Sequence, residues 1–351
     1  MTHGERLKYL IKVVVSHVLY YLGLLHLWQS IVMRRKAVIL MYHRVLTREE
    51  REHTGSHPAI VVDRETFAKQ MAALKRRFVV LSLTEFADRM ERGVPFPNSS
   101  CLITFDDGWR DTFINALPIL RQHGLPAVVF VPVNYIGRRR LFWQEALTHL
   151  LVRVAMEVKG NPGRRSRFRD LLAPAGLEQV VDLTDADPRP SLIVAISKQK
   201  QVTVSIIEET LTTLATELGV RTDTLTAIDG FMDWGQVEEM SRHGIAFGGH
   251  GAEHRLLTQV SSNEALSEIS AAREVIDGRL KEAVPTFSYP NGYWTPEVVQ
   301  MVKASGYRLA FVTKRGLVSC HDDRFTIRRL NIHESVTDST PMFLARLVGL
   351  F

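Results

Sequence analysis

Residues 101–108 read Cys-Leu-Ile-Thr-Phe-Asp-Asp-Gly, an apolar run that ends in two adjacent carboxylates and a glycine. This pattern is typical of a buried parallel strand that delivers acidic groups to the rim of a sheet. Because side chains alternate along an extended chain, Asp106 and Asp107 point in different directions, so one can bind a cation while the other handles a proton. Gly108 lets the chain turn toward a helix that we expect near Asp111. An ordinary surface turn is the alternative, but it would not explain a pair of histidines later in the chain.

Strand and helix patterns alternate on both sides of this stretch. The runs that we expect to form strands are 37–41, 78–81, 127–131, 245–248, 286–289 and 309–312, with 325–332 closing the set. Helical spacing of apolar residues between these runs favours parallel βαβ units. The residues alone therefore predict an α/β fold, either a sheet or a barrel.

One connection is far longer than the short loops usual in α/β units. It separates the runs at 127–131 and 245–248, so we expect an insertion at about 138–232 with a helix over 203–218. Because it follows the carboxyl end of a strand, the insertion should lie on the active face. It carries four arginines within 164–169. It would either cover the site or grip a long substrate, while a helical decoration with a solvated basic face is equally compatible.

The first segment, residues 1–36, is apolar and has no formal charge over 13–33. A bilayer takes roughly 20 apolar residues, but polar residues interrupt this run and basic residues flank both of its ends, so charge bias gives no orientation. We expect 7–33 to form an interfacial helix on a membrane, with Trp28 at headgroup level. A helix packed on its own domain is the next alternative, and a true span ranks third. No secretory cleavage site is recognised.

Composition narrows the classes of function. The chain has 351 residues, of which 45% are hydrophobic and 23% charged, which is typical of a globular protein. The net charge of +6 permits attraction to anionic surfaces without establishing it, and we expect no nucleic-acid partner. Cys101 and Cys320 form neither a disulfide framework nor a metal-type spacing. Phosphate loops, dinucleotide glycine fingerprints and Gly-x-Ser-x-Gly elbows are absent from the sequence.

A pair of histidines supplies the second half of a candidate site. His250 and His254 follow an expected strand directly, and on one helical turn residues four apart face the same way, so both imidazoles could reach one ion. Two histidines and one carboxylate leave coordination positions open for water and substrate. The turn at 287–292 could aim a peptide N–H at a developing oxyanion. His43 also follows a strand and is a further candidate, although a lone histidine is usually structural.

These stretches carry a resemblance to a known family. Residues 104–108, 250–254 and 287–292, together with 40–45, resemble in order and position the polysaccharide deacetylases, the NodB-homology carbohydrate esterases. The resemblance runs from about 38 to 333, interrupted by the insertion. It implies a distorted (β/α)7-type barrel over 37–340, one divalent metal ion and hydrolysis of N-acetyl groups on sugars. Zinc is the expected ion, with cobalt, nickel or manganese as alternatives.

The resemblance also assigns roles to individual residues. It makes Asp107, His250 and His254 the metal ligands and Asp106 the general base. The N–H of Asn291 would hold the oxyanion, and His333 is the candidate general acid. Candidate substrate-binding residues are His43, Tyr289, Pro290 and Trp143.

Two positions depart from the family pattern. Ser288 stands where many members have an arginine that braces the catalytic aspartate, and Gly251 stands where many have serine or threonine. Arg44 or Arg329 could substitute for the missing arginine.

We expect an N-acetylated polysaccharide or lipid-linked sugar as substrate, with the chain at a membrane and the cytoplasm as the alternative location. A catalytically silent glycan-binding barrel and a hydrolase of non-sugar amides are the rival readings. The run 341–351 would cap the barrel or join the N-terminal segment on a membrane.

Overall fold

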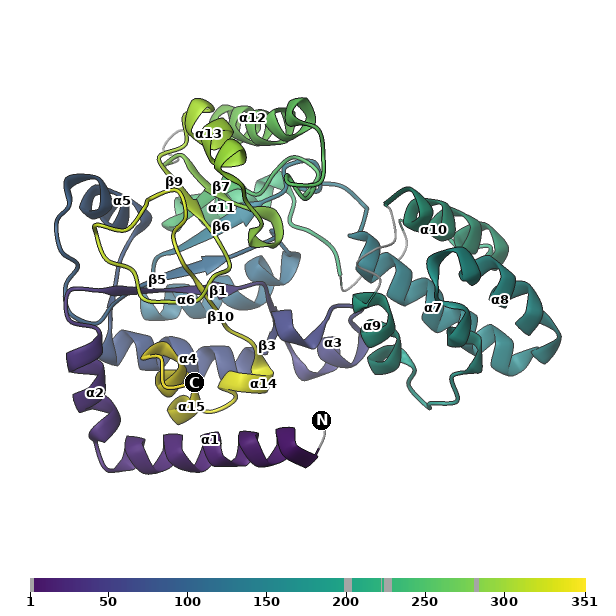
Figure 1. Ribbon diagram of the computed structural model, residues 1–351, viewed down its shortest axis with the longest axis horizontal. Helices are drawn as coiled ribbons and strands as arrows, with labels where there is room; N and C mark the ends of the chain where they lie inside the picture. Colours follow the sequence, from purple (N-terminus) through teal and green to yellow (C-terminus); the bar gives the residue numbers. More distant parts are fainter. Residues whose placement is uncertain (1–2, 199–203, 222, 224–228, 281–283) are drawn as a thin grey trace. The chain divides into compact units, whose positions relative to one another are not determined.

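The computed structural model describes residues 3–198, 204–221, 223, 229–280 and 284–351 (Figure 1). These residues form two units, and each is described by itself. The first unit comprises 1–48, 58–137 and 232–351, and the second comprises 49–57 and 138–231.

A curled parallel sheet forms the centre of the first unit. Its strands are β1 (Ala37–Tyr42), β4 (Val79–Val80), β5 (Ser100–Phe105), β6 (Ala127–Val131), β7 (Ile245–Gly249), β8 (Thr286–Ser288), β9 (Leu309–Phe311) and β10 (Leu330–Asn331). They lie in the order β10-β1-β5-β6-β7-β8-β9, with β4 beside β5. Near the end of the chain, Ile327 bridges to Phe311 of β9, and Leu330 then pairs with Leu40 of β1. One irregular segment thus links the two ends of the sheet, which confirms the distorted (β/α)7-type barrel.

The buried strands explain why the polar residues gather at one edge. Every residue of β1, β5 and β6 is buried, as expected for parallel strands covered on both faces. Because the strands are parallel, their carboxyl ends meet at the same rim. Asp106 and Asp107 therefore follow β5 at the rim where His250 follows β7 and the turn at 289–292 follows β8.

Helices surround this sheet (Figure 1). They are α4 (Arg64–Arg77), α5 (Leu83–Arg92), α6 (Leu117–His123), α11 (Trp234–Arg242), α12 (Ser262–Arg279), α13 (Pro296–Ala304), α14 (Glu334–Thr337) and α15 (Thr340–Leu347), and a small sheet pairs β2 (Arg44–Leu46) with β3 (Val61–Asp63). Capping boxes begin α11 at Asp233 and α12 at Ser261. The helix expected soon after the acidic strand opens with a π-helical turn, Thr112–Ala116, before the regular α6. Such turns are frequent at functional sites.

The apolar N-terminal segment forms two helices, α1 (His3–Tyr21) and α2 (Leu24–Val32). They break at Gly23, whose φ of 73° is in the left-handed region, and they are bent by 92° relative to each other. By length and composition, no single helix of the described residues could cross a membrane, whereas this bent pair passes the same test together. The C-terminal helix α15 contacts both α1 and α4, and its apolar side chains are buried within the unit.

The second unit is a helical cluster with its own core. Its helices are α3 (Arg48–His53, with Arg48 in the first unit), α7 (Trp143–Gly160), α8 (Arg165–Leu172), α9 (Arg189–Ser197) and α10 (Val204–Leu218). Thr203, expected to begin the last of these, lies outside the described residues. All four arginines of 164–169 lie within 3.8 Å of a carboxylate, for example Arg169 on Asp182 at 2.8 Å. Acidic neighbours therefore offset the charge of this face, while Arg165, Arg167 and Arg169 stay about half exposed to solvent.

Candidate metal centre and active site

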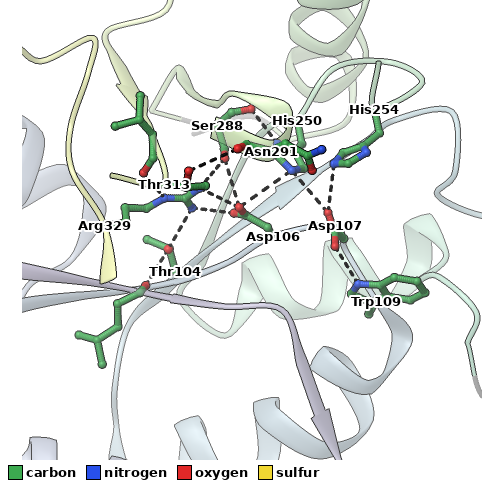
Figure 2. Close-up of polar contacts among 12 residues, drawn as sticks. Thr104, Asp106, Asp107, Trp109, His250, His254, Ser288, Asn291, Thr313 and Arg329 are labelled. Carbon is green, nitrogen blue, oxygen red and sulfur yellow. Dashed lines mark hydrogen bonds and ion pairs between the residues drawn. The ribbon is translucent and has the colours of Figure 1, made fainter. Parts of the chain in front are cut away.

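The three predicted metal ligands meet at the rim of the barrel. Single ligand atoms of Asp107, His250 and His254 all lie within 4.8 Å of one another. Oδ1 of Asp107 is 3.4 Å from Nε2 of His250 and 3.5 Å from Nε2 of His254 (Figure 2). Ligands about 2.0–2.2 Å from a tetrahedral zinc ion are separated by about 3.4 Å. The donor set and its spacing therefore fit one divalent ion.

The two histidines reach this position by a different route from the one expected. His250 follows β7, and its backbone N–H donates to the carbonyl of Val131, but residues 250–254 form no helical turn. The expectation of a helical turn is wrong. His254 has a left-handed backbone with φ 56°, in a loop that curls back toward the strand end. Asp107, with φ 73°, is in the same region, and such backbone conformations cluster at functional sites.

Glu268 of α12 fixes the loop between the histidines. Its carboxylate accepts the backbone N–H groups of Ala252 and Glu253 at 2.9 and 2.8 Å. A Cβ atom at Gly251 would lie 2.8 Å from this carboxylate, and the φ of Gly251 is +76°. The departure from the serine or threonine of the family pattern thus has a local steric cause.

Hydrogen bonds outside the ligand set orient it. Nδ1 of His250 lies 2.7 Å from the carbonyl oxygen of Ser288, so this nitrogen carries a proton and Nε2 is the atom that faces Oδ1 of Asp107. The indole of Trp109 donates to Oδ2 of Asp107 at 3.0 Å, which leaves Oδ1 facing both imidazoles (Figure 2). The guanidinium of Arg44 covers the Trp109 ring at 4.3 Å. The sequence analysis missed Trp109, although its place just after Gly108 could have drawn attention to it.

Arg329 braces Asp106. Nη1 and Nη2 of Arg329 each lie 2.7 Å from one carboxylate oxygen of Asp106, and both side chains are buried. Nη2 also donates to the hydroxyl of Ser288 at 2.8 Å. The guanidinium that many relatives place at position 288 thus comes here from the residue before β10. Arg44, the other candidate, pairs with Asp111 instead.

The charges around the carboxylates set their protonation. Burial alone would raise the pKa of Asp106, but the charges of Arg329 and His250 outweigh it and lower that pKa. Burial likewise opposes the lowered pKa of Asp107, which results from the hydrogen bond with His250 and the charge of His254. Burial and the charge of His250 lower the pKa of His254 to about 4. Ionised carboxylates and a neutral imidazole are the forms that bind a cation.

The remaining predicted residues divide into two groups. His43 follows β1 at the rim where Asp106 follows β5, because Tyr42 is paired with Phe105. Asn291 has a left-handed backbone with φ 54° in the turn after β8, and Figure 2 shows it beside His250 and Asp106.

Four other candidates have the following surroundings. Tyr289 is fully buried and donates its hydroxyl to the carbonyl of Phe325, so its assignment to substrate binding is wrong. Pro290 is buried as well and shapes the turn. Trp143 begins α7 in the second unit, where it packs against that unit's core. His333 follows β10 at the same rim, because Asn331 is paired with Met41 of β1, and its carbonyl accepts a hydrogen bond from the hydroxyl of Thr337.

Comparisons with known proteins agree with this geometry. The sequence model for polysaccharide deacetylase matches residues 93–159 and 196–310, more than half of the chain. YxkH of Bacillus subtilis is 18% identical over 305 residues, which cover 87% of this chain and 74% of that protein. The poly-beta-1,6-N-acetyl-D-glucosamine N-deacetylase of Staphylococcus epidermidis is 34% identical over 113 residues, covering 30% of this chain and 38% of that protein. Among solved structures, the Streptococcus pyogenes deacetylase PplD in complex with acetate has the same fold, with a TM-score of 0.56 at 18% identity over 89% of this chain and 98% of that chain.

Replacing Arg329 with methionine should destabilise the protein strongly, because the buried carboxylate of Asp106 loses its cation. We expect the free energy of unfolding in urea to fall by about 3–5 kcal/mol. Arg324→Met is the matched control, since Arg324 is half exposed and pairs with Glu91 at 3.6 Å. It should cost less than about 1 kcal/mol.

The double variant Asp106→Asn/Arg329→Met separates the ion pair from general packing. Removing both charges should make the double variant more stable than the sum of the single losses predicts, with a coupling of at least about 1 kcal/mol. Strictly additive losses would contradict the direct pairing.

Proposed function

Since the chain belongs to the polysaccharide deacetylase family, we propose that it hydrolyses N-acetyl groups on an N-acetylated polysaccharide or lipid-linked sugar. The observation that carries this proposal is the meeting of Asp107, His250 and His254 beside the braced carboxylate of Asp106. The name of the Staphylococcus epidermidis relative makes an N-acetylglucosamine polymer the first substrate to test.

Asp107, His250 and His254 are proposed to hold one divalent ion. Their spacing and the set of two imidazoles and one carboxylate support zinc, and cobalt, nickel and manganese are the alternatives. When bound, such an ion lowers the pKa of a water molecule and polarises a carbonyl oxygen.

Asp106 is the proposed general base. Its Oδ2 lies 3.9 Å from Nε2 of His250, so it borders the ligand set without completing it. Arg329 fixes both carboxylate oxygens and keeps the group ionised, ready to accept the proton of an attacking water molecule. The N–H of Asn291, in the turn that follows β8, is proposed to donate to the oxyanion that forms on the acetyl group.

Exposed aromatic side chains support a sugar substrate. Tyr293 and Trp294, which follow the turn at Asn291, are 54% and 43% exposed. Large rings at a site entrance offer apolar faces on which the faces of sugar rings can pack. Pro290 is proposed to support this turn, and Trp143 stays a candidate substrate-binding residue.

Two alternative functions have less support than the deacetylase. A silent glycan-binding barrel was considered because Ser288 replaces the expected arginine. Arg329 supplies that guanidinium, which favours the enzyme. A hydrolase of non-sugar amides would use the same residues and differ only in substrate.

With zinc or cobalt added, the purified protein should release acetate from N-acetylglucosamine oligomers. Asp106→Asn should lower kcat by a factor on the order of 10² to 10⁴, because it removes the base. Asp170→Asn, on an exposed part of the second unit, is the control and should match the wild type. Oligomer binding without acetate release would favour the silent barrel. Acetate released only from simple amides would favour the non-sugar reading.

Trp109→Phe should weaken metal binding while leaving the three ligands in place. Loss of the hydrogen bond to Oδ2 frees Asp107 to rotate, and we expect a 10–100-fold lower zinc affinity in a competition titration. Trp294→Phe, which alters an exposed ring, should leave the affinity unchanged. An unchanged affinity in Trp109→Phe would show that the indole does not orient the ligand.

The general acid is proposed to be His43, with His333 as the alternative. His43 directly follows Tyr42, whose carbonyl accepts the backbone N–H of Asp106, and Nδ1 of His43 is buried without a hydrogen-bond partner among the described residues. His43→Asn should lower kcat on sugar oligomers by a factor on the order of 10² or more. The loss of kcat should be far smaller on an amide whose leaving amine needs no protonation. The same pattern in His333→Asn, and not in His43→Asn, would return the role to the residue that the family resemblance indicates.

A further inference from the structure

We propose that α1 and α2 dock the protein onto the surface of an anionic phospholipid bilayer. Of 20 large hydrophobic side chains that are exposed in the described residues, 12 lie on these helices and the turn between them. We call this set the N-terminal apolar face. Its members are Leu7, Leu10, Ile11, Val14, Val15, Val18, Tyr21, Leu22, Leu24, Leu27, Trp28 and Ile31.

Both helices expose large apolar side chains, unlike a helix on a water-exposed surface. Two polar side chains lie on the inner side together with the apolar Leu25. Ser16 is buried against Met342 of α15, and Gln29 is buried and donates to the carbonyl of Arg77. The outer side is aliphatic, with Val14 59% and Leu27 59% exposed. An ordinary surface helix turns its apolar stripe inward, so this arrangement indicates an apolar medium outside.

The charge of this region matches an anionic lipid surface. Residues 6–36 contain six cations and no aspartate or glutamate. The cations lie at the two ends of the segment, where they can reach headgroups while the apolar residues between them enter the acyl boundary. All six are exposed, namely Arg6, Lys8, Lys12, Arg34, Arg35 and Lys36.

The bend between the helices favours a surface position. A break of 92° prevents α1 and α2 from running as one straight helix through a bilayer. With 19 residues, α1 extends about 28 Å, long enough to lie along an interface. The indole of Trp28 donates to the carbonyl of Val348 at 3.4 Å, which ties α2 to the end of the chain.

The same charge disfavours a second copy of this chain as the occupant. Two such faces meeting symmetrically would bring cations together without acidic partners from this segment. A bilayer instead offers anionic headgroups and a hydrocarbon phase in one surface.

The test is co-sedimentation of the full chain with vesicles of phosphatidylcholine, alone or mixed with phosphatidylglycerol. Val14→Glu/Leu27→Glu should reduce the partition coefficient on mixed vesicles by at least tenfold. Met156→Glu/Val194→Glu is the matched control, because it places the same charges on exposed apolar positions of the second unit, and it should bind as the wild type does. Equal losses in both variants, or no binding by the wild type, would overturn the proposal.

A second arm tests the charges. Arg6→Gln/Lys8→Gln/Arg34→Gln should weaken binding to mixed vesicles by a factor on the order of 10² and leave binding to phosphatidylcholine unchanged. Sedimentation equilibrium without lipid is measured alongside: a dimer that Val14→Glu/Leu27→Glu dissolves would mean that the face binds a second copy. All of these variants should release acetate from soluble oligomers at the wild-type rate, so failure here is distinguishable from failure of the proposed enzymatic function.

Discussion

The ion pair between Arg329 and Asp106 is the interaction on which the rest of the site depends. A carboxylate buried to this extent is unfavourable unless a cation and hydrogen bonds compensate it. Arg329 provides both, and it also donates to the carbonyl of Val312 and the hydroxyl of Thr104. One guanidinium therefore connects β5 with β8, the end of β9 and the start of β10. The contact between Arg329 and Asp106 thus stabilises the buried carboxylate and also fixes the segment that closes the barrel.

Asp107, whose backbone is left-handed just beyond the end of β5, has a different set of partners from Asp106. Asp106 faces the arginine, whereas Asp107 faces the imidazoles and is fixed from behind by Trp109. Both oxygens of Asp106 contact Arg329, Oδ2 of Asp107 accepts from Trp109, and Oδ1 of Asp107 faces the two imidazoles. In the proposed function, this separation lets Asp106 accept a proton while Asp107 stays a metal ligand, and both roles need an ionised carboxylate.

The sequence predicted the strand order along the chain, the insertion and the stretches that meet at the rim, because parallel strands with apolar cores deliver their following residues to one edge. It did not predict how His254 reaches the rim, since a loop with left-handed residues has no periodic signature. The burial of Tyr289 depends on packing against the segment at Phe325, which is remote in sequence. From the sequence, Arg329 and Arg44 are equally plausible partners of Asp106. Only the folded barrel shows that Arg329 pairs with Asp106 and Arg44 with Asp111. The acidic partners of the arginines at 164–169 could likewise not be predicted, because the helices bring these residues together only in the folded unit.

Anomalous diffraction from crystals grown with zinc tests the central claim most directly. One zinc peak should lie about 2.0–2.2 Å from Oδ1 of Asp107 and from Nε2 of both His250 and His254, with Asp106 still paired to Arg329. A zinc ion bound elsewhere with these three atoms apart, or a peak that engages Asp106 in place of Asp107, would contradict the assignment of one carboxylate to the ion and the other to the proton.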